Sequence, residues 1–244
     1  MAGDKTVSGE RVAVDGSNFV EYAENWLVEK IGRVLESSAH CHLMLAGGTT
    51  PLPLYRALSR RKEIPWSRIS IYFGDERCVP NDTPENNAYT VLHALFPNGR
   101  PEGVTIYRMC GEENPDKAAR DYESILPEQI DILLLGMGAD GHTASLFPGS
   151  AALDETQRKV MPVIGSKPPM QRLTVTPPVI KQAGYLLLMA AGEDKADAVR
   201  WALSDGSVPA SLARNGDWLL DRMAGRALLN AGIASDGAAY ISSS

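Results

Sequence analysis

The sequence has little of what secreted, membrane-spanning or nucleic-acid-binding proteins need. It contains three cysteines, an odd number without C-x-x-C spacing, which is typical of a reducing compartment. No apolar run approaches membrane-spanning length, and the first ten residues lack the apolar core of a signal peptide. With 24 basic and 30 acidic residues, the formal net charge of −6 argues against nucleic acid or a membrane as the main partner. We therefore expect a cytoplasmic protein.

What the sequence does contain is a regular alternation of apolar strands with amphipathic helices. At 244 residues and 44% hydrophobic, the chain could form one large α/β domain or two small ones, and it shows no repeat or interdomain linker. We predict a single α/β domain over residues 1–244, with a largely parallel sheet covered by helices on both faces. Besides the central strand described below, strands are predicted at 11–14, 42–46, 69–73, 104–107, 172–176, 185–190 and, as an edge strand, 218–220.

Capping residues indicate where several helices begin. Asn18 followed three residues later by Glu21 has the spacing of a capping box, and the helix after it should run to about residue 35. Thr50 is a favoured N-cap before Pro51, which predicts a helix through Leu58. Other helices are predicted over 85–95, 115–126, from 177, over 193–203 and over 224–229; the segment 151–169 is assigned no element, and 208–212 is a connection.

The chain is organised around residues 131–149, DILLLGMGADGHTASLFPG. Ile132 to Leu135 show no polar alternation, as expected of a central strand that is covered on both faces. The glycines that follow free the backbone from ordinary limits and let a ligand approach it closely. His142 then lies at the carboxyl end of a central strand, where open α/β sheets bind their ligands. His142, with Asp140 two residues earlier, is therefore the candidate catalytic group.

Three other interpretations of this stretch were weighed. Gly136, Gly138 and Gly141 spell the G-x-G-x-x-G fingerprint of dinucleotide sites, but Pro148 and Gly149 interrupt the helix that the fingerprint requires. A lone histidine can also simply cap or pack, although a glycine-rich loop after a buried strand is an unusual place for that. A metal site needs more ligands than the aspartate and histidine of this loop, and no other histidine or cysteine stands at ligand spacing. We expect no metal and no organic cofactor.

A second candidate site is the segment 47–51, GGTTP. It lies between a predicted strand and a predicted helix, so that unpaired backbone N–H groups and the helix dipole would favour a phosphate there. The alternative is a tight turn with a capping residue and no ligand. The segment is not a Walker A loop, because no G-K-[ST] follows, which makes nucleoside triphosphate chemistry improbable.

Three motifs together resemble one enzyme family. LAGGTTPLPLY at 45–55, FGDERCVP at 73–80 and LGMGADGHTASLFP at 135–148 are similar to the 6-phosphogluconolactonases, which are related to the glucosamine-6-phosphate deaminases. The resemblance covers nearly the whole chain. It implies a modified Rossmann-like α/β fold and hydrolysis of 6-phospho-D-glucono-1,5-lactone to 6-phosphogluconate in the pentose phosphate pathway, without a metal or cofactor.

The candidate residues suit that chemistry. Histidine titrates near neutral pH, so His142 can take a proton from water and return it to the leaving ring oxygen. Asp140 would orient the imidazole or stabilise its cationic form, and amides of the glycine turn would stabilise the oxyanion. The phosphate would be held by the loop residues Gly47, Gly48, Thr49 and Thr50. By resemblance Asp75, Arg77, Arg172 and Lys195 would also bind the substrate, the three basic side chains supplying positive charge.

Two other functions remain as alternatives. A glucosamine-6-phosphate isomerase/deaminase would use Asp75 for proton transfer, but its pattern carries a Phe-Asn-Glu run after the histidine, where this chain has Ala144 to Pro148 without an acid. A non-catalytic sugar-phosphate sensor would carry an added DNA-binding domain, for which the residues before the first predicted strand leave no room. The expected partner is a small sugar-phosphate lactone, and the protein is expected to be a monomer or a homodimer.

Overall fold

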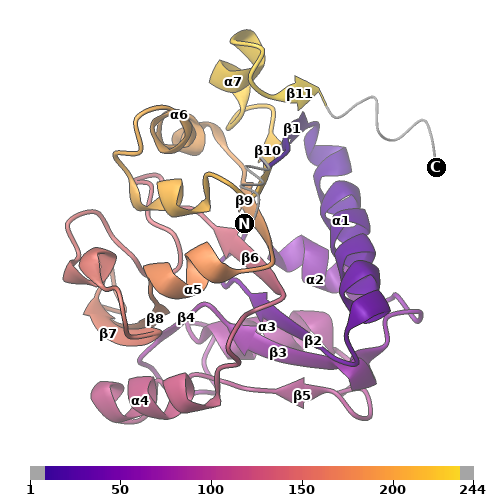
Figure 1. Ribbon diagram of the computed structural model, residues 1–244, viewed down its shortest axis with the longest axis vertical. Helices are drawn as coiled ribbons and strands as arrows, with labels where there is room; N and C mark the ends of the chain where they lie inside the picture. Colours follow the sequence, from indigo (N-terminus) through magenta and orange to yellow (C-terminus); the bar gives the residue numbers. More distant parts are fainter. Residues whose placement is uncertain (1–8, 237–244) are drawn as a thin grey trace, which may run out of the picture.

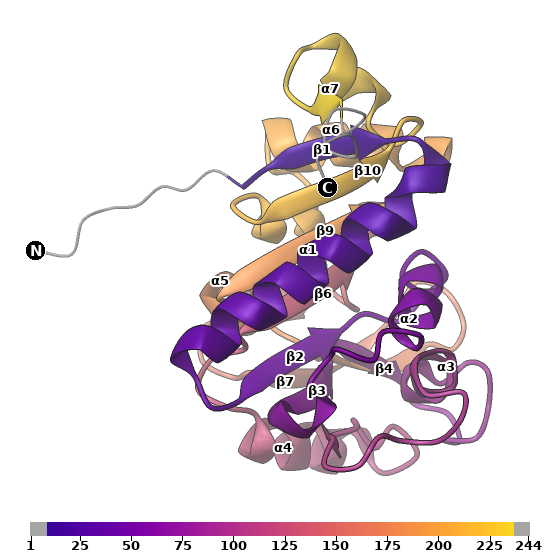
Figure 2. The same ribbon diagram turned by 90° about the vertical axis from the view of Figure 1, so that its right-hand side faces the viewer.

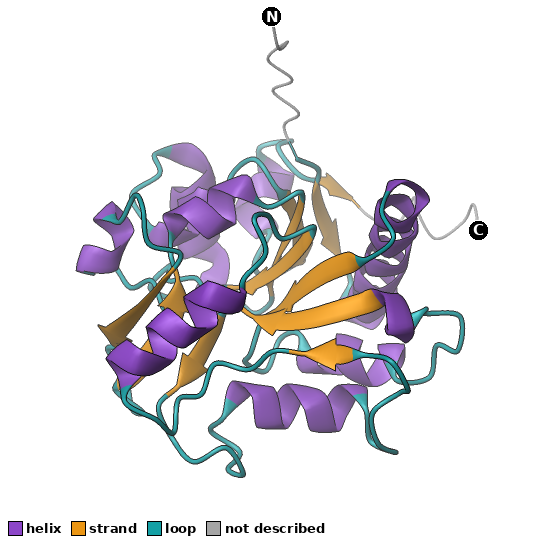
Figure 3. Ribbon diagram, turned by 60° about the horizontal axis from the view of Figure 1, so that its bottom comes forward, coloured by secondary structure: helices purple, strands orange, loops and turns teal. Residues whose placement is uncertain are grey.

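The computed structural model, which describes residues 9–236, is built around one large parallel sheet (Figures 1 and 3). Eight strands pair in the order β11-β1-β10-β9-β6-β2-β3-β5, and every pairing between them is parallel. Their bounds are β1 Arg11–Val14, β2 Cys41–Leu45, β3 Ile69–Phe73, β5 Thr105–Ile106, β6 Ile132–Gly136, β9 Tyr185–Ala190, β10 Asp217–Asp221 and β11 Ser235–Asp236.

Helices cover both faces of this sheet, as predicted. One face packs against α1, α2 and α3, and the other against α4, α5, α6 and α7. Figure 2 shows α1 lying along the first of these faces. The bounds are α1 Gly16–Ser37, α2 Leu52–Leu58, α3 Asn87–Leu95, α4 Pro115–Ile125, α5 Pro177–Gln182, α6 Ala196–Ser204 and α7 Arg226–Asn230. Short 3₁₀ helices occupy Trp66–Arg68, Ala151–Asp154, Glu193–Lys195 and Pro209–Ala213.

A small antiparallel sheet stands apart from the large one. It pairs β4 Asp75–Arg77 with β8 Gln171–Val175, and β8 in turn with β7 Val160–Ile164. The predicted strand 172–176 is therefore present, shifted by one residue, but it belongs to this second sheet. The segment 151–169, assigned no element from the sequence, supplies β7 and one of the 3₁₀ helices.

Three local predictions were wrong. α1 begins at Gly16 after Asp15, so Asn18 and Glu21 lie inside the helix; the carboxylate of Asp15 accepts a hydrogen bond from Arg222 Nε at 2.6 Å rather than capping the helix. α2 begins at Leu52, so that Thr50 lies in a turn before it. β10 is not an edge strand, because it pairs with β1 on one side and β9 on the other. For Asp15 and for β10, a partner distant in the sequence decides what the local pattern does not.

The topology brings the predicted site segments to one edge of the large sheet. β9, β6, β2 and β3 are consecutive neighbours, and all four run in the same direction. Each of these strands is followed at its carboxyl end by a predicted site segment. In the same order, these segments are Gly192 to Lys195, the loop 137–147, the GGTT segment, and Asp75 to Arg77. This edge is the place where parallel α/β sheets bind ligands.

Candidate active site

A histidine–aspartate pair lies in the loop after β6. His142 Nδ1 is 2.5 Å from Asp140 Oδ1, and the same oxygen accepts the backbone N–H of His142 at 3.2 Å. Both side chains are partly exposed, at 30% and 42%. Partial burial opposes ionisation of Asp140, but the hydrogen bonds from the amide and ring of His142 bring the pKa of that carboxyl below its ordinary value. The two residues predicted from the sequence are thus in contact through Nδ1 of the histidine, and Nε2 makes no contact with Asp140.

The glycines of this loop fix the histidine in place. The amide of Gly138 donates to the carbonyl of His142 at 2.9 Å, and the amide of Gly141 donates to the carbonyl of Gly138 at 3.0 Å. A Cβ on Gly138 would lie 2.2 Å from the imidazole ring, and Gly141 has a φ of 78°, which favours glycine. Because both amides are engaged inside the loop, neither is available as the oxyanion donor expected from the glycine turn.

The ring of Phe147 lies between the His142 ring and a cation. Its centroid is 4.6 Å from that of the His142 ring, and the guanidinium carbon of Arg172 lies 5.4 Å from the Phe147 ring centroid. Phe147 is itself 6% exposed. An aromatic side chain therefore occupies the position beside the imidazole, where the sequence predicted only the absence of an acid.

Two arginines stand side by side on the small sheet without a carboxylate partner. Arg77 and Arg172 are register partners in the β4–β8 pairing, and neither forms an ion pair within residues 9–236. Arg172 is 8% exposed and donates to the backbone carbonyls of Lys167 and Pro169; Arg77 donates from Nη1 to the carbonyl of Glu85, while its buried Nε has no partner among the described residues. Burial and the neighbouring Arg77 lower the pKa of Arg172. The nearby Asp75 carboxylate opposes that lowering, but neither guanidinium forms an ion pair in the described part of the chain, so the two arginines favour an anion.

Lys195 differs from the arginines because it already has a partner. It ends the short 3₁₀ helix after β9, is 18% exposed, and its ammonium contacts the carboxylate of Asp194. That contact and the charge of Lys167 contribute to a lowered pKa of Asp194. Lys167 also supplies a carbonyl to Arg172. Lys167 therefore links the segment of Arg172 to that of Asp194 and Lys195.

The GGTT segment forms an exposed turn between β2 and α2. Gly48 has a φ of 87°, and the hydroxyls of Thr49 and Thr50 make no hydrogen bond within the described part of the chain. Gly47 packs directly on Asn87, since a Cβ there would lie 2.0 Å from the Asn87 side-chain oxygen. Two free hydroxyls and a glycine backbone at the edge of the sheet are consistent with the predicted phosphate loop.

Asp75, expected to bind the substrate, and its neighbour Glu76 are both buried. The Asp75 carboxylate accepts from Asn87 Nδ2 at 3.0 Å and from Ser145 Oγ at 2.6 Å. Glu76 is fully buried and accepts the backbone N–H groups of Asn87 and Ala88 at the start of α3. Burial nevertheless raises the pKa of Glu76 to about 7. Asn87 and Ser145 were not predicted as site residues, because neither carries a motif signal of its own.

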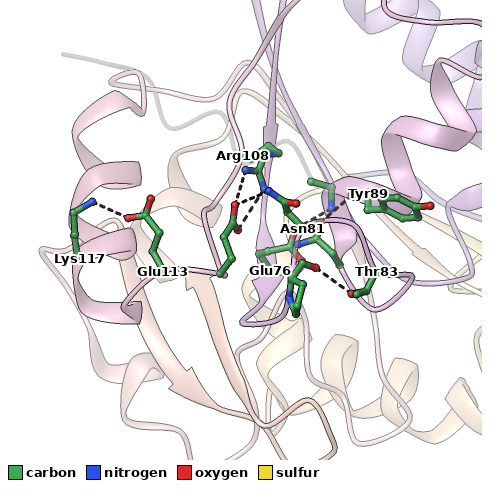
Figure 4. A network of polar contacts seen from close by, with 11 residues as sticks. Glu76, Asn81, Thr83, Tyr89, Arg108, Glu113 and Lys117 are labelled. Carbon is green, nitrogen blue, oxygen red and sulfur yellow. Dashed lines mark hydrogen bonds and ion pairs between the residues drawn. The ribbon is translucent and has the colours of Figure 1, made fainter.

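Figure 4 shows how the segment after Arg77 is held beside Glu76. Asn81 Nδ2 donates to Glu112 Oε1 at 2.9 Å, and Arg108 donates to the same oxygen at 2.8 Å. Thr83 Oγ1 donates to the carbonyl of Pro80 at 3.0 Å and closes the turn. These exposed contacts fix the loop that carries Arg77 into α3.

A cavity of about 770 Å³ opens beside Arg172. It is lined by Phe147 and Arg172, by the start of α4, and by the β7 segment that the sequence left unassigned. Within residues 9–236 no group of three or more His, Cys, Asp or Glu side chains could hold a metal ion. Over the same residues, none of the helices has the length and apolar character needed to cross a bilayer.

Comparison with known proteins places these features in context. Residues 15–220 match the family described as glucosamine-6-phosphate isomerases/6-phosphogluconolactonase. The chain is 35% identical over 230 residues to a 6-phosphogluconolactonase of Mycobacterium tuberculosis (85% of this chain, 93% of the relative) and 36% identical over 236 residues to one of Streptomyces coelicolor (86% and 90%). The solved 6-phosphogluconolactonase of Trypanosoma brucei superposes with a TM-score of 0.81 at 26% identity (91% and 99% covered), and that of Thermotoga maritima with 0.77 at 28% (87% and 99%).

Proposed function

Because the chain belongs to the glucosamine-6-phosphate isomerase/6-phosphogluconolactonase family, we propose that it hydrolyses 6-phospho-D-glucono-1,5-lactone to 6-phosphogluconate. The observation that carries the proposal is a histidine–aspartate pair in the loop after β6 together with two arginines of the small sheet that form no ion pair among the described residues. A lactone with a phosphate needs both features: a base for water at the carbonyl and cations for the dianion.

In the proposed reaction His142 acts as general base and then as general acid. Because the ionised carboxylate of Asp140 accepts a hydrogen bond from His142 Nδ1, the proton of the neutral ring lies on Nδ1. The lone pair of Nε2 is then free to take a proton from water. The hydroxide equivalent adds to the lactone carbonyl. The tetrahedral oxyanion then collapses, the ring C–O bond breaks, and the proton on Nε2 passes to the departing oxygen. Asp140 stabilises the imidazolium that exists between the two transfers.

Recognition of the substrate is assigned to the basic groups and the glycine loop. Arg77 and Arg172 offer guanidinium donors in a fixed arrangement, and Lys195 adds a point charge. The segment Gly47 to Thr50 offers backbone N–H groups and two hydroxyls that have no partner within residues 9–236. The substrate would then lie with its phosphate toward the small sheet and its carbonyl toward His142.

The isomerase/deaminase activity of the same family is the second candidate. That reaction needs a carboxylate free to move a proton between two carbons, whereas the Asp75 carboxylate is buried and accepts hydrogen bonds on both oxygens. It also needs an acid–base group for ring opening, and the His142 ring contacts Phe147 instead of a second acid. Both observations favour hydrolysis.

The proposal is tested with freshly prepared 6-phosphogluconolactone. Product formation is followed by coupling to 6-phosphogluconate dehydrogenase, with the spontaneous opening of the lactone subtracted. Glucosamine 6-phosphate is assayed in parallel by ammonia release. Rapid lactone hydrolysis supports the proposal. Ammonia release without lactone hydrolysis would move the chain to the deaminase activity, and neither activity would favour a sugar-phosphate sensor.

A further inference from the structure

The buried carboxylate of Asp75 joins two loops that the proposed reaction uses separately. Its Oδ2 accepts the hydroxyl proton of Ser145 at 2.6 Å, and its Oδ1 accepts from Asn87 Nδ2 at 3.0 Å. Asp75 is 7% exposed, Asn87 1% and Ser145 fully buried. Hydrogen bonds to a charged group in such surroundings are stronger than those between neutral groups and fix geometry well.

On one side this contact reaches the loop that carries the base. Ser145 follows His142 by three residues, and the residue between Thr143 and Ser145 (Ala144) has a φ of 47°, which turns the chain sharply. The amide of Ser145 donates to Thr174 Oγ1 of β8 at 3.1 Å, and a bridge joins Thr143 to Leu146. The backbone of Ser145 is thus fixed, and its hydroxyl is aimed at Asp75.

On the other side the contact reaches the phosphate loop. Asn87 is the first residue of α3, and its Nδ2 donates both to the carboxylate and to the backbone carbonyl of Asp75, each at 3.0 Å. Gly47 rests on the same side chain, with room for a hydrogen but not for a methyl group. The position of the GGTT turn therefore depends on where Asp75 holds Asn87.

We propose that Ser145 is a positioning residue of this active site: its hydroxyl locks Asp75 as an anchor that sets the distance between the His142 loop and the phosphate loop. The assignment rests on the proposed function, because it is the lactone that must span the two loops. It also makes Asp75 an acceptor with both oxygens engaged, and so keeps that carboxylate out of proton transfer to the substrate.

The first test compares Ser145→Ala with Ser70→Ala. Ser70 is a similarly buried serine whose hydroxyl contacts His40 Nε2 at 2.9 Å in a part-buried hydrogen bond at the opposite end of β3, so each change removes a serine hydroxyl that has a side-chain partner. We expect kcat to fall by about 10- to 100-fold in Ser145→Ala alone, because a loop displaced by about 1 Å has that effect on a reaction. The Kd for 6-phosphogluconate, measured by calorimetry, should change by less than about threefold, since the arginine pair is intact. Equal kcat values in the two variants would overturn the proposal.

The second test asks whether Asp75 acts through Ser145. Asp75→Asn preserves the shape of the side chain and one acceptor oxygen, so kcat should fall by about as much as in Ser145→Ala. The kcat of the double variant should be no lower than that of the less active single variant, because both changes disturb the same contact between Ser145 and Asp75. Additive losses, or a loss above about 10³-fold in Asp75→Asn alone, would instead place Asp75 in the chemistry.

A third readout does not need turnover and separates this inference from the proposed function. The ring resonances of His142, recorded by NMR in the free protein, should shift in Ser145→Ala and Asp75→Asn and stay unchanged in Ser70→Ala. An unshifted ring would overturn the anchoring role, even in an active enzyme. A wild-type protein that fails to hydrolyse the lactone would overturn the proposed function, while shifted rings would still support the anchor.

Discussion

At the scale of single residues, most of the polar side chains of the site already have a hydrogen-bond or ion-pair partner within the protein. Asp140 is engaged by His142, Asp75 by Ser145 and Asn87, and Lys195 by Asp194. The arginine pair is different, since neither guanidinium has a carboxylate partner among the described residues. The groups that we expect to meet the substrate are those left with unused donors or an unused lone pair.

Replacing the base should slow chemistry without disturbing the fold. We expect His142→Ala to lower kcat by about 10²–10⁴-fold, the range associated with loss of a general base. His93→Ala is the matched control, because His93 lies exposed on α3, away from the site, and bonds only the carbonyl of Tyr89. Initial rates of both variants measure the effect on kcat, and their thermal unfolding midpoints show whether the fold is preserved. A near-native kcat in His142→Ala would remove the residue from this role.

Removing a buried guanidinium should weaken phosphate recognition. Arg172→Ala should raise KM by about 10-fold or more, since a charge-assisted contact contributes roughly 1.5–3 kcal/mol. Arg200→Ala, an exposed arginine on α6, serves as the control. Because Arg172 also packs on Phe147 beside the base, a smaller decrease in kcat is expected as well. An unchanged KM would contradict a role in binding the phosphate.

At the scale of secondary-structure elements, the sequence predicted what local patterns control. β1, β3 and β9 have the predicted bounds, and the predicted site segments other than Arg172 follow strands of the large sheet. The small sheet was missed because β4 has only three residues, β7 contains Pro162, and β4 pairs with β8, which lies more than 90 residues further along the chain. Periodicity over a short window carries no information about such pairing. The buried partners Ser145 and Asn87 were missed for the same reason.

The start of α3 should make stability depend on pH. Glu76 has a pKa of about 7 in the folded protein against an ordinary value of 4.5, so between these values the folded state binds more protons than the unfolded state. The contribution of Glu76 to the free energy of unfolding is therefore greatest below pH 4.5 and is lost as the pH rises to about 7. The loss amounts to about 3 kcal/mol at most.

This dependence is measured as the difference in unfolding free energy between wild type and Glu76→Gln at several pH values. Urea titrations from pH 4.5 to 8 suffice, and the other titrating groups cancel in the difference. The advantage of wild type should shrink as the pH rises. An advantage that grows with pH would mean that the N–H groups of Asn87 and Ala88 outweigh the burial of the carboxylate.

At the scale of the whole molecule, a chain with a net charge of −6 presents a local cluster of positive groups at one edge of its sheet. The sign of the net charge therefore says little about the ligand. Salt largely screens exposed charges that lie more than about 8 Å from a bound ligand, so that the charges close to it dominate. It does favour a small anion that fits between the side chains over an extended polyanion. The cavity beside Arg172 is of the size that small ligands occupy.

Chelation should leave the activity intact. Residues 9–236 contain no cluster of three potential metal ligands, and the proposed reaction uses a histidine to activate water. Hydrolysis rates measured after dialysis against EDTA should equal those of untreated enzyme. Loss of activity that added zinc or magnesium restores would contradict the metal-free mechanism.

The position of β1 in the sheet has a consequence for how the protein is made. β1 comes from residues 11–14, yet its neighbours are β10 and β11, which begin at residues 217 and 235. On the ribosome the first strand therefore waits, unpaired, until nearly all of the chain has emerged. The strand is almost entirely buried in the finished molecule, so the nascent chain must keep this apolar segment from other partners meanwhile.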